Sequence, residues 1–177
     1  GAHVLNCFAY TGGFAIAALA AGARHATSIE SSAPAIAQAR AHQAANGIAD
    51  DAADWIEGDV FHVLRDLRNR ARQFDLIILD PPKFAPLAAH VERASRAYKD
   101  INLLALKLLR VGGHLATFSC SGAIDAALFQ KIVAGAALDA GADAAIVARL
   151  GAADDHPVAL TFPEGDYLKG FLIRRIT

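Results

Sequence analysis

Short apolar runs alternate with helix-like patterns along this chain, and this alternation restricts the fold more than any other feature of the sequence. Runs such as DLIILD and HLATFS are apolar almost throughout, as expected of strands that are covered on both faces. A repeat of strand, helix and strand predicts an α/β fold with a largely parallel sheet and helices on both faces. The predicted strands are Val4–Phe8, His25–Glu30, Asp54–Gly58, Phe74–Asp80, His114–Ser119, Ala144–Leu150 and Gly170–Ile176.

The segments between these runs show helical spacing. Apolar residues recur at helical intervals in segments 60–67 and 101–108, and the second helix is expected to stop at Gly112-Gly113 because helix C-termini favour glycine. Asp125 has the residue type of a helix N-cap. The last two predicted strands are joined by about 20 residues with turn signals and no helical period, so we expect the final strand to run antiparallel.

Length and composition set the class of protein. The 177 residues are enough for one domain with a sizeable core, and no long uncharged apolar run predicts a membrane span. Only two cysteines occur and no signal peptide is visible, which favours a reducing, cytoplasmic setting. The chain has no methionine and opens on GAHVLN, which already looks like a strand, so we expect a piece of a longer protein.

Acidic side chains follow three consecutive predicted strands, at the sheet edge where α/β proteins bind ligands. Glu30 lies about 20 residues after the glycine turn of loop 8–13, a place typical of a carboxylate that binds ribose hydroxyls; it also fits a helix cap. Asp59 fits either a helix cap or a partner for an adenine amino group. The dinucleotide pattern GxGxxG is absent, which disfavours NAD.

The third acid, Asp80, stands in the stretch LDPPKF. Pro81 and Pro82 fix two φ angles and remove two backbone donors directly after a buried strand. The Asp80 carboxylate and the neighbouring carbonyl groups are therefore held as a rigid, acceptor-rich edge. Such an edge suits the rim of a flat nitrogen base.

The stretch HLATFSCSGA ends a strand on Cys120, between two serines and before a glycine. A cysteine is more often a small buried residue than a reactive one. Its position at the strand end favours a thiol at the mouth of a site. Cys7, inside the first predicted strand, is expected to be buried. No cysteine or histidine spacing predicts a metal site, and His156 has no partner ligand at such a spacing.

Taken together, these residues resemble the class I S-adenosylmethionine-dependent RNA methyltransferases, specifically the single-chain bacterial enzymes that methylate cytosine at carbon 5 in large-subunit ribosomal RNA. The resemblance runs over nearly all of the chain, and the combination of DPPKF, TFSCSG and YLKGF is specific. The other matching segments are VLNCFAYTGGFA, SIESS, EGDVFHVLR, YKDINLLALKLL and LFQKI.

The resemblance implies a Rossmann-like sheet of seven strands in the order 3-2-1-4-5-7-6, with the last strand antiparallel. It also implies an N-terminal RNA-binding PUA domain that this sequence lacks. We therefore expect residues 1–177 to be a catalytic domain whose missing region recruits most of the ribosomal RNA. The nearly neutral net charge of −1 agrees with that expectation, because a domain that grips nucleic acid alone is usually basic.

The resemblance also assigns roles to residues. The methionine part of S-adenosylmethionine would lie against Phe8, Tyr10, Thr11 and Gly12. The ribose would bind Glu30 and Ser31, the adenine Asp59 and Val60, and Asp80 would border both cofactor and base. The target base would meet Asp80, Pro81, Pro82 and Lys83. Lys83 stands where other RNA cytosine-5 methyltransferases carry a second cysteine.

Cys120 would be the nucleophile. Its thiolate would add to carbon 6 of cytosine and make carbon 5 reactive, which is covalent catalysis. We expect the helix start after Ser121-Gly122 to favour the thiolate. We expect burial to raise the pKa of Asp80, so that its protonated form binds ring nitrogen 3.

Two other functions fit parts of the sequence. A methyltransferase acting on a purine nitrogen also uses a DPP edge and needs no thiol. A non-catalytic module that binds S-adenosylmethionine is the second alternative, and the high apolar content leaves room for a homodimer. Tyr98, Lys99 and Asp100 are expected at a solvated helix start, with a position facing the site as the alternative. The arginines of segment 65–72 are expected on a solvated face rather than in a phosphate-binding stripe.

Overall fold

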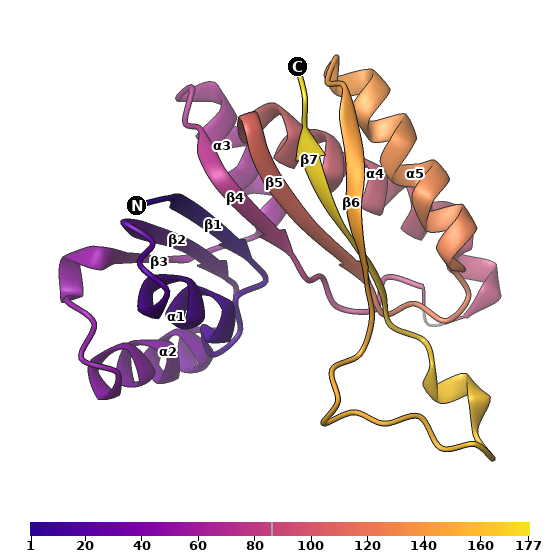
Figure 1. The fold of residues 1–177 in the computed structure, drawn as a ribbon, viewed down its shortest axis with the longest axis horizontal. Coiled ribbons are helices and arrows are strands. Elements are labelled where there is room, and N and C mark those ends of the chain that lie inside the picture. The colour runs from indigo at the N-terminus through magenta and orange to yellow at the C-terminus, as the bar shows by residue number, and fades with distance from the viewer. Residues whose placement is uncertain (86) are drawn as a thin grey trace.

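The computed structural model describes residues 1–85 and 87–177, and in them seven strands form one sheet in the order β3-β2-β1-β4-β5-β7-β6 (Figure 1). The strands are β1 His3–Cys7, β2 His25–Glu30, β3 Ala53–Glu57, β4 Phe74–Leu79, β5 Leu109–Ser119, β6 Ala144–Leu150 and β7 Lys169–Arg175. The α-helices are α1 Gly13–Ala20, α2 Ala33–Ala45, α3 Val60–Asn69, α4 Val91–Leu108 and α5 Ala126–Ala140.

Strands β1 to β5 pair in parallel, while β7 runs antiparallel to both β5 and β6. The predicted strand order, the antiparallel last strand and the helices on both faces are confirmed. The long connection between β6 and β7 contains only a single short 3-10 turn, Pro163–Gly165, among its described elements. It projects beyond the sheet at the end where β4 and β5 finish (Figure 1).

Two predicted boundaries in the middle of the chain are wrong. Gly112-Gly113 does not stop a helix: α4 ends at Leu108 and β5 begins at the next residue. Gly112 instead takes a φ of 81°, and a Cβ on Gly113 would lie 2.9 Å from the Asp75 carbonyl oxygen of β4. The two glycines therefore allow an irregularity in β5, where the register against β4 shifts.

Helix α4 also begins earlier than expected, at Val91, so Tyr98, Lys99 and Asp100 lie in its middle rather than at a solvated start. Tyr98 is fully buried. Lys99 pairs with Asp139 of α5 at 2.8 Å, and Asp100 pairs with Arg65 of α3. The helix is longer than the predicted segment 101–108, because its apolar face also packs into the core at Ala94 and Tyr98.

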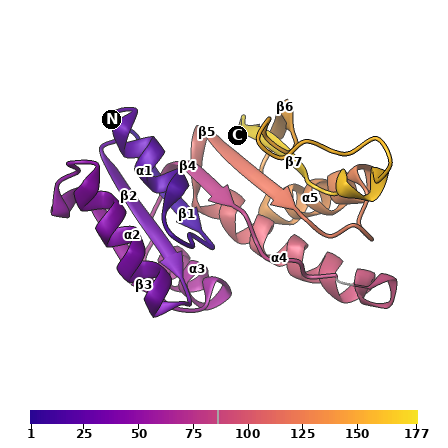
Figure 2. The same ribbon diagram turned by 90° about the horizontal axis from the view of Figure 1, so that it is seen from below.

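The core is divided by the sheet. A large cluster packs β1, β4 and β5 against α3, α4 and α5, and a smaller one packs the other face against α1. Figure 2, which looks from the end where β4 and β5 finish, shows α1 on one side of these strands and α4 on the other. The side chains that follow β4 and β5 therefore emerge between two packed layers.

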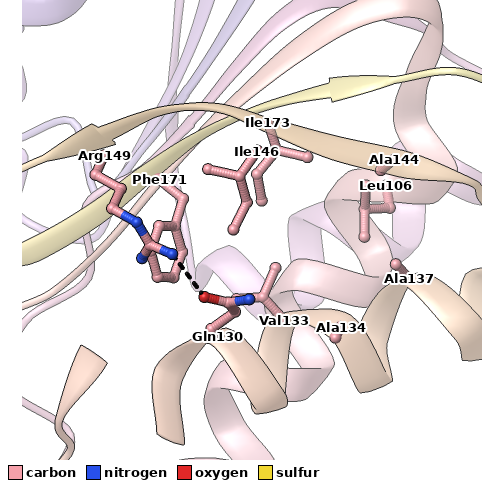
Figure 3. A pocket seen from close by; sticks show the side chains of 10 residues that line it. All are labelled: Leu106, Gln130, Val133, Ala134, Ala137, Ala144, Ile146, Arg149, Phe171 and Ile173. Atoms are coloured by element: carbon pink, nitrogen blue, oxygen red, sulfur yellow. Dashed lines mark hydrogen bonds between the residues drawn. The ribbon is translucent and has the colours of Figure 1, made fainter. Parts of the chain in front are cut away.

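The outer edge of the sheet has a cavity of its own. Helix α5 packs across β6 and β7 and leaves a space of about 410 Å³ lined mostly by apolar side chains (Figure 3). Arg149 of β6 donates a hydrogen bond of 3.0 Å to Gln130 of α5 beside it. This cavity contains no residue that the sequence assigned to a site. Among the described helices, none has the length and apolar character needed to cross a membrane.

Candidate functional site

The loop after β1 is a tight turn held by unusual backbone angles. Phe8 and Tyr10 have positive φ values of 58° and 47°, and Gly12 has a φ of 84°. The Ala9 amide donates to the Ile29 carbonyl at 3.0 Å, which ties the loop to the end of β2. Gly12 is required on structural grounds, because a Cβ there would lie 2.4 Å from the Trp55 ring. The remaining residue of the turn, Thr11, is held through its carbonyl by the His42 ring at 3.1 Å.

Glu30 sits at the end of β2 and accepts hydrogen bonds from three backbone amides. Those of Tyr10 and Ser31 lie at 2.8 Å and that of Ser32 at 2.9 Å. Glu30 does not cap α2, because the Ser32 hydroxyl accepts from Ala35 there. The three amides use only part of the acceptor capacity of a carboxylate. Glu30 is therefore a fixed, half-buried anionic acceptor beside the β1 loop.

Asp59 and Val60 follow β3. Asp59 caps α3 by accepting a hydrogen bond from the His62 amide at 2.9 Å, which confirms the predicted helix cap. The Val60 side chain is buried in the larger core cluster. Only the second carboxylate oxygen of Asp59 and the backbone of Val60 are left for a ligand.

The ends of β4 and β5 bring Asp80 and Cys120 into one groove. These strands are adjacent and parallel, with Leu79 opposite Thr117. The Cys120 thiol donates a long hydrogen bond to the Pro81 carbonyl, with Sγ 3.7 Å from the oxygen. Asp80 and Cys120 both line a groove of about 760 Å³. Its other walls are formed by Phe14, Phe118 and parts of segment 150–168.

The two cysteines differ in burial, as predicted. Cys7 is completely buried in β1, and burial raises its pKa far above the ordinary value. Cys120 is half-buried and borders the groove. A sulfur sealed in the core, or turned away from Asp80, would have been incompatible with the predicted site.

The predicted activation of Cys120 by a helix start is wrong. Helix α5 begins at Ala126, with Asp125 as its N-cap, so Cys120 lies before an intervening turn. Burial raises the pKa of the Cys120 thiol, and the nearby Asp80 charge raises it further. The backbone amide of Cys120 acts in the opposite direction, and Lys83 and Lys169 add a smaller lowering effect. This amide and the two cations, rather than the terminus of α5, favour the thiolate here.

Asp80 has the electrostatics expected from the sequence. The residue is exposed overall, yet surrounding protein atoms desolvate its carboxyl group, and this burial raises its pKa. Its neighbours divide by exposure: Pro81 is buried, whereas Pro82 and Lys83 are exposed. The Lys83 ammonium lies 5.9 Å from the centre of the Tyr167 ring, which lines the groove.

Several residues of the site were not recognised in the sequence. Phe14 and Phe118 stack at 6.2 Å in the groove wall, and Tyr167 also lines the groove. Lys169 donates to the carbonyls of Ser121 and Ile124 at 2.8 and 2.6 Å. Lys169 belongs to the stretch YLKGF, so a motif marked its importance without giving its role.

Comparison with known proteins identifies the fold and the cofactor class. A family model described as S-adenosylmethionine-dependent methyltransferase matches residues 1–160. A protein named "Ribosomal RNA large subunit methyltransferase I" from Shewanella amazonensis is 52% identical over 98% of this chain, and one from Aeromonas salmonicida is 51% identical over 97%. The chain covers only 44% and 43% of these two relatives.

Solved structures agree with this result. A methyltransferase from Streptococcus mutans superposes with a TM-score of 0.85 at 25% identity, over 99% of this chain and 45% of its own. The structure of SMU.776 complexed with SAH gives a TM-score of 0.83 at the same identity, over 99% and 45% of the two chains. With a family model that spans most of its length, this chain belongs to the S-adenosylmethionine-dependent methyltransferases.

Proposed function

We propose that this chain transfers a methyl group from S-adenosylmethionine to carbon 5 of a cytosine in large-subunit ribosomal RNA, through a covalent adduct with Cys120. The observation that carries the proposal is the pairing of a thiol and a carboxyl group in one groove, at the ends of adjacent strands. The RNA class comes from the relatives named as ribosomal RNA large subunit methyltransferases. We infer that the additional length of those relatives includes the region that recruits most of the RNA.

The residues around the β1 loop fit the cofactor. A fixed carboxylate at Glu30 can accept hydrogen bonds from ribose hydroxyls, and the free oxygen of Asp59 can accept from the adenine amino group. The backbone of segment 8–12 bends at three positive φ angles, and this bent loop would hold the methionine part. S-adenosylmethionine supplies an electrophilic methyl group on a sulfonium sulfur. The protein would hold this methyl group near Asp80.

The target base needs a nucleophile and an acid. Addition of the Cys120 sulfur to carbon 6, with a proton from Asp80 to ring nitrogen 3, turns carbon 5 into a nucleophile. Asp80 suits this role because burial raises its pKa and favours the protonated form. After methyl transfer, a base takes the carbon 5 proton, the Cys120 thiolate leaves carbon 6, and ring nitrogen 3 returns its proton to the Asp80 carboxylate, which restores the neutral aromatic ring.

The two groups also affect each other. The negative charge of Asp80 is one cause of the raised Cys120 pKa. Protonation of Asp80 removes that charge, so the thiolate becomes easier to form when the acid is ready to donate. Lys83 and Lys169 lower the thiol pKa as well, and Lys83 is exposed beside Tyr167 of the groove wall, where it can contact substrate.

One observation favours a second candidate, methyl transfer to a purine nitrogen. The raised Cys120 pKa disfavours the thiolate, and the Pro81 carbonyl next to Asp80 provides acceptors that would bind an amino group without any thiol chemistry. Digesting methylated RNA to nucleosides separates the two candidates, because the label is then found either on cytosine carbon 5 or on a purine.

The decisive experiment replaces Cys120 by alanine in the full-length protein. We expect methyl transfer to ribosomal RNA to fall at least about 10³-fold, as losses of a nucleophile do, while affinity for S-adenosylmethionine stays within twofold. Cys7→Ala is the matched control: Cys7 is sealed in β1 and does not line the groove, so its loss should leave the rate of the folded protein unchanged. Undiminished transfer by Cys120→Ala would remove the covalent mechanism.

A further inference from the structure

The serines on either side of Cys120 are fully buried, although Cys120 itself borders the groove. The chain is extended as it leaves β5, so successive side chains point to opposite sides. Ser119 and Ser121 therefore point into the core when Cys120 points out. A buried hydroxyl is costly unless it has a hydrogen-bond partner, so the partners of these two serines carry information.

Both serines meet the same group, the hydroxyl of Tyr98 on α4. Ser119 donates to it at 3.0 Å, and the oxygens of Tyr98 and Ser121 are 3.2 Å apart. The Ser121 amide donates back to the Ser119 hydroxyl at 3.3 Å. Tyr98 is itself fully buried between the rings of Phe84 and Phe129, at 4.8 and 5.4 Å. The ring therefore has little freedom to move.

The Ser121 hydroxyl also contacts the loop that follows Asp80. The Ser121 hydroxyl accepts a hydrogen bond of 3.0 Å from the Ala85 amide, which lies in the loop that begins with Pro81. The Phe84 ring of that loop packs against the Tyr98 ring at a tilt of 51°. A continuous set of buried hydrogen bonds thus links the loop of Asp80, the loop of Cys120 and helix α4. Lys169 holds the Ser121 carbonyl from the other side.

We propose that the Tyr98 hydroxyl positions Cys120: with Ser119 and Ser121 it fixes the loop that carries the thiol against the loop that carries Asp80. The proposal rests on the proposed function, since it explains how two groups on separate strands keep the spacing that a single base requires. Tyr98 lies beneath the groove and is a positioning residue, not one that touches the substrate.

Tyr98→Phe tests this with the loss of one oxygen. We expect kcat to fall on the order of 10- to 100-fold, because small displacements of a reacting group cost that much. KM for RNA and the affinity for S-adenosylmethionine should stay within twofold, since Tyr98 contacts neither the groove surface nor the β1 loop. Thr117→Val is the matched control: it removes a buried β5 hydroxyl that has no hydrogen-bond partner in the described chain.

Alkylation of Cys120 by iodoacetamide gives a second measurement, whose rate should rise in the variant in which kcat falls. In the wild-type protein Cys120 is half-buried and donates to Pro81. A loosened loop exposes the sulfur, so alkylation of Cys120 in Tyr98→Phe should become several times faster while methyl transfer becomes slower. Cys7 is the internal reference, because it is buried in the core and is alkylated only when the domain opens.

A double variant completes the test. If the hydroxyls act as one unit, Tyr98→Phe with Ser121→Ala loses no more activity than the worse single variant. The proposal is overturned if kcat of Tyr98→Phe is unchanged, if the two losses multiply, if Cys120 alkylation does not accelerate, or if Cys7 alkylation accelerates in parallel. Should Cys120→Ala remain active, the covalent mechanism fails separately, and the alkylation rates alone decide whether Tyr98 positions the thiol.

Discussion

The cofactor half of the site and the substrate half are built in different ways. Around the β1 loop, order comes from the backbone: left-handed residues, a glycine against a ring, and amides bound to the Glu30 carboxylate. Around Cys120, order comes from side chains far apart in the sequence. Ser121 binds Ala85 and Tyr98, 36 and 23 residues away, and Lys169 reaches back 48 residues to Ser121.

This difference has a physical consequence. A turn set by positive φ angles and one fixed acceptor is held mainly through its own backbone, with ties to Ile29 and His42, and presents the same groups to the same ligand. A loop held by buried side chains depends on distant elements, and a change in α4 or β7 can shift the nucleophile without touching it. The cofactor half should therefore respond to local substitutions, and the substrate half to remote ones.

The largest expected effect of a local change is at Gly12. Gly12→Ala places a Cβ 2.4 Å from a Trp55 ring that cannot easily retreat, because its indole N–H donates to Gln43 at 2.8 Å. Overpacking and a left-handed alanine together cost about 2–4 kcal/mol of stability. Urea unfolding measures this loss, with binding of S-adenosylmethionine weakened in parallel.

Gly13→Ala is the matched control for that prediction. Nothing lies within 4 Å of its added Cβ, and the residue begins α1 without a positive φ. It should be neutral or stabilise the protein by up to about 1 kcal/mol. Equal losses at both positions would mean that the glycines serve general flexibility, and the contrast between a rigid turn and a side-chain-held loop would fail.

A smaller effect is expected at Glu30. Glu30→Gln removes the charge and turns an amide N–H₂ toward one of the three backbone donors. Hydrogen bonds to charged groups contribute about 1.5–3 kcal/mol, so affinity for S-adenosylmethionine should fall about 10- to 100-fold. Calorimetric titration measures it, and iodoacetamide alkylation of Cys120 should not change.

Ser32→Ala separates loop order from ligand contact. It removes the α2 cap and costs about 1 kcal/mol of stability or less, because the bond to Ala35 is long at 3.4 Å. Its affinity for S-adenosylmethionine should match wild type. If Ser32→Ala weakened binding as strongly as Glu30→Gln, the carboxylate would be acting through the loop and not on the ribose.

The same contrast explains how far the sequence alone could be used. Strand order, the acid at each strand end and the proximity of Asp80 to Cys120 follow from periodicity, topology rules and the family resemblance. The caps at Asp59 and Asp125 follow from local residue types. These features depend on neighbours within a few residues, or on how strands must be connected.

The features that were missed depend on contacts across the fold. Tyr98 was expected on a solvated helix start, because nothing local reveals that the serine at the end of β5 and another two residues later will lie against its hydroxyl. Gly112-Gly113 resembled a helix stop, because the close approach of Asp75 that requires Gly113 lies on another strand. The direction of the Cys120 pKa likewise depends on burial and on the distance to Asp80.

The smallest expected effect is on the folding stability of the protein when Asp80 is replaced. It tests whether the burial of this carboxyl group, which suits it to its role as an acid, lowers the stability of the fold. Burial raises the pKa of this carboxyl in the folded protein, so the charged form is disfavoured there relative to the unfolded chain. Below the unfolded pKa the group is protonated in both states and costs nothing. As pH rises through the folded pKa, the charge must form inside the fold and stability is lost.

Asp80→Asn has no such charge. Its melting temperature should exceed that of wild type by a small margin at pH 7 to 8, and the difference should vanish as pH falls below the ordinary range of an aspartate. The Asp80→Asn variant should not transfer methyl groups in the pH range where it is more stable than wild type, because asparagine cannot supply the acidic proton. Thermal melts from pH 3 to 8 measure the crossover, with Asp125→Asn as a control, because asparagine can accept the Leu128 amide at this exposed helix cap and no gain at pH 8 is expected. A lower melting temperature for Asp80→Asn at pH 8 would show that the carboxylate is satisfied in the fold, and would remove the reason to assign it the role of acid.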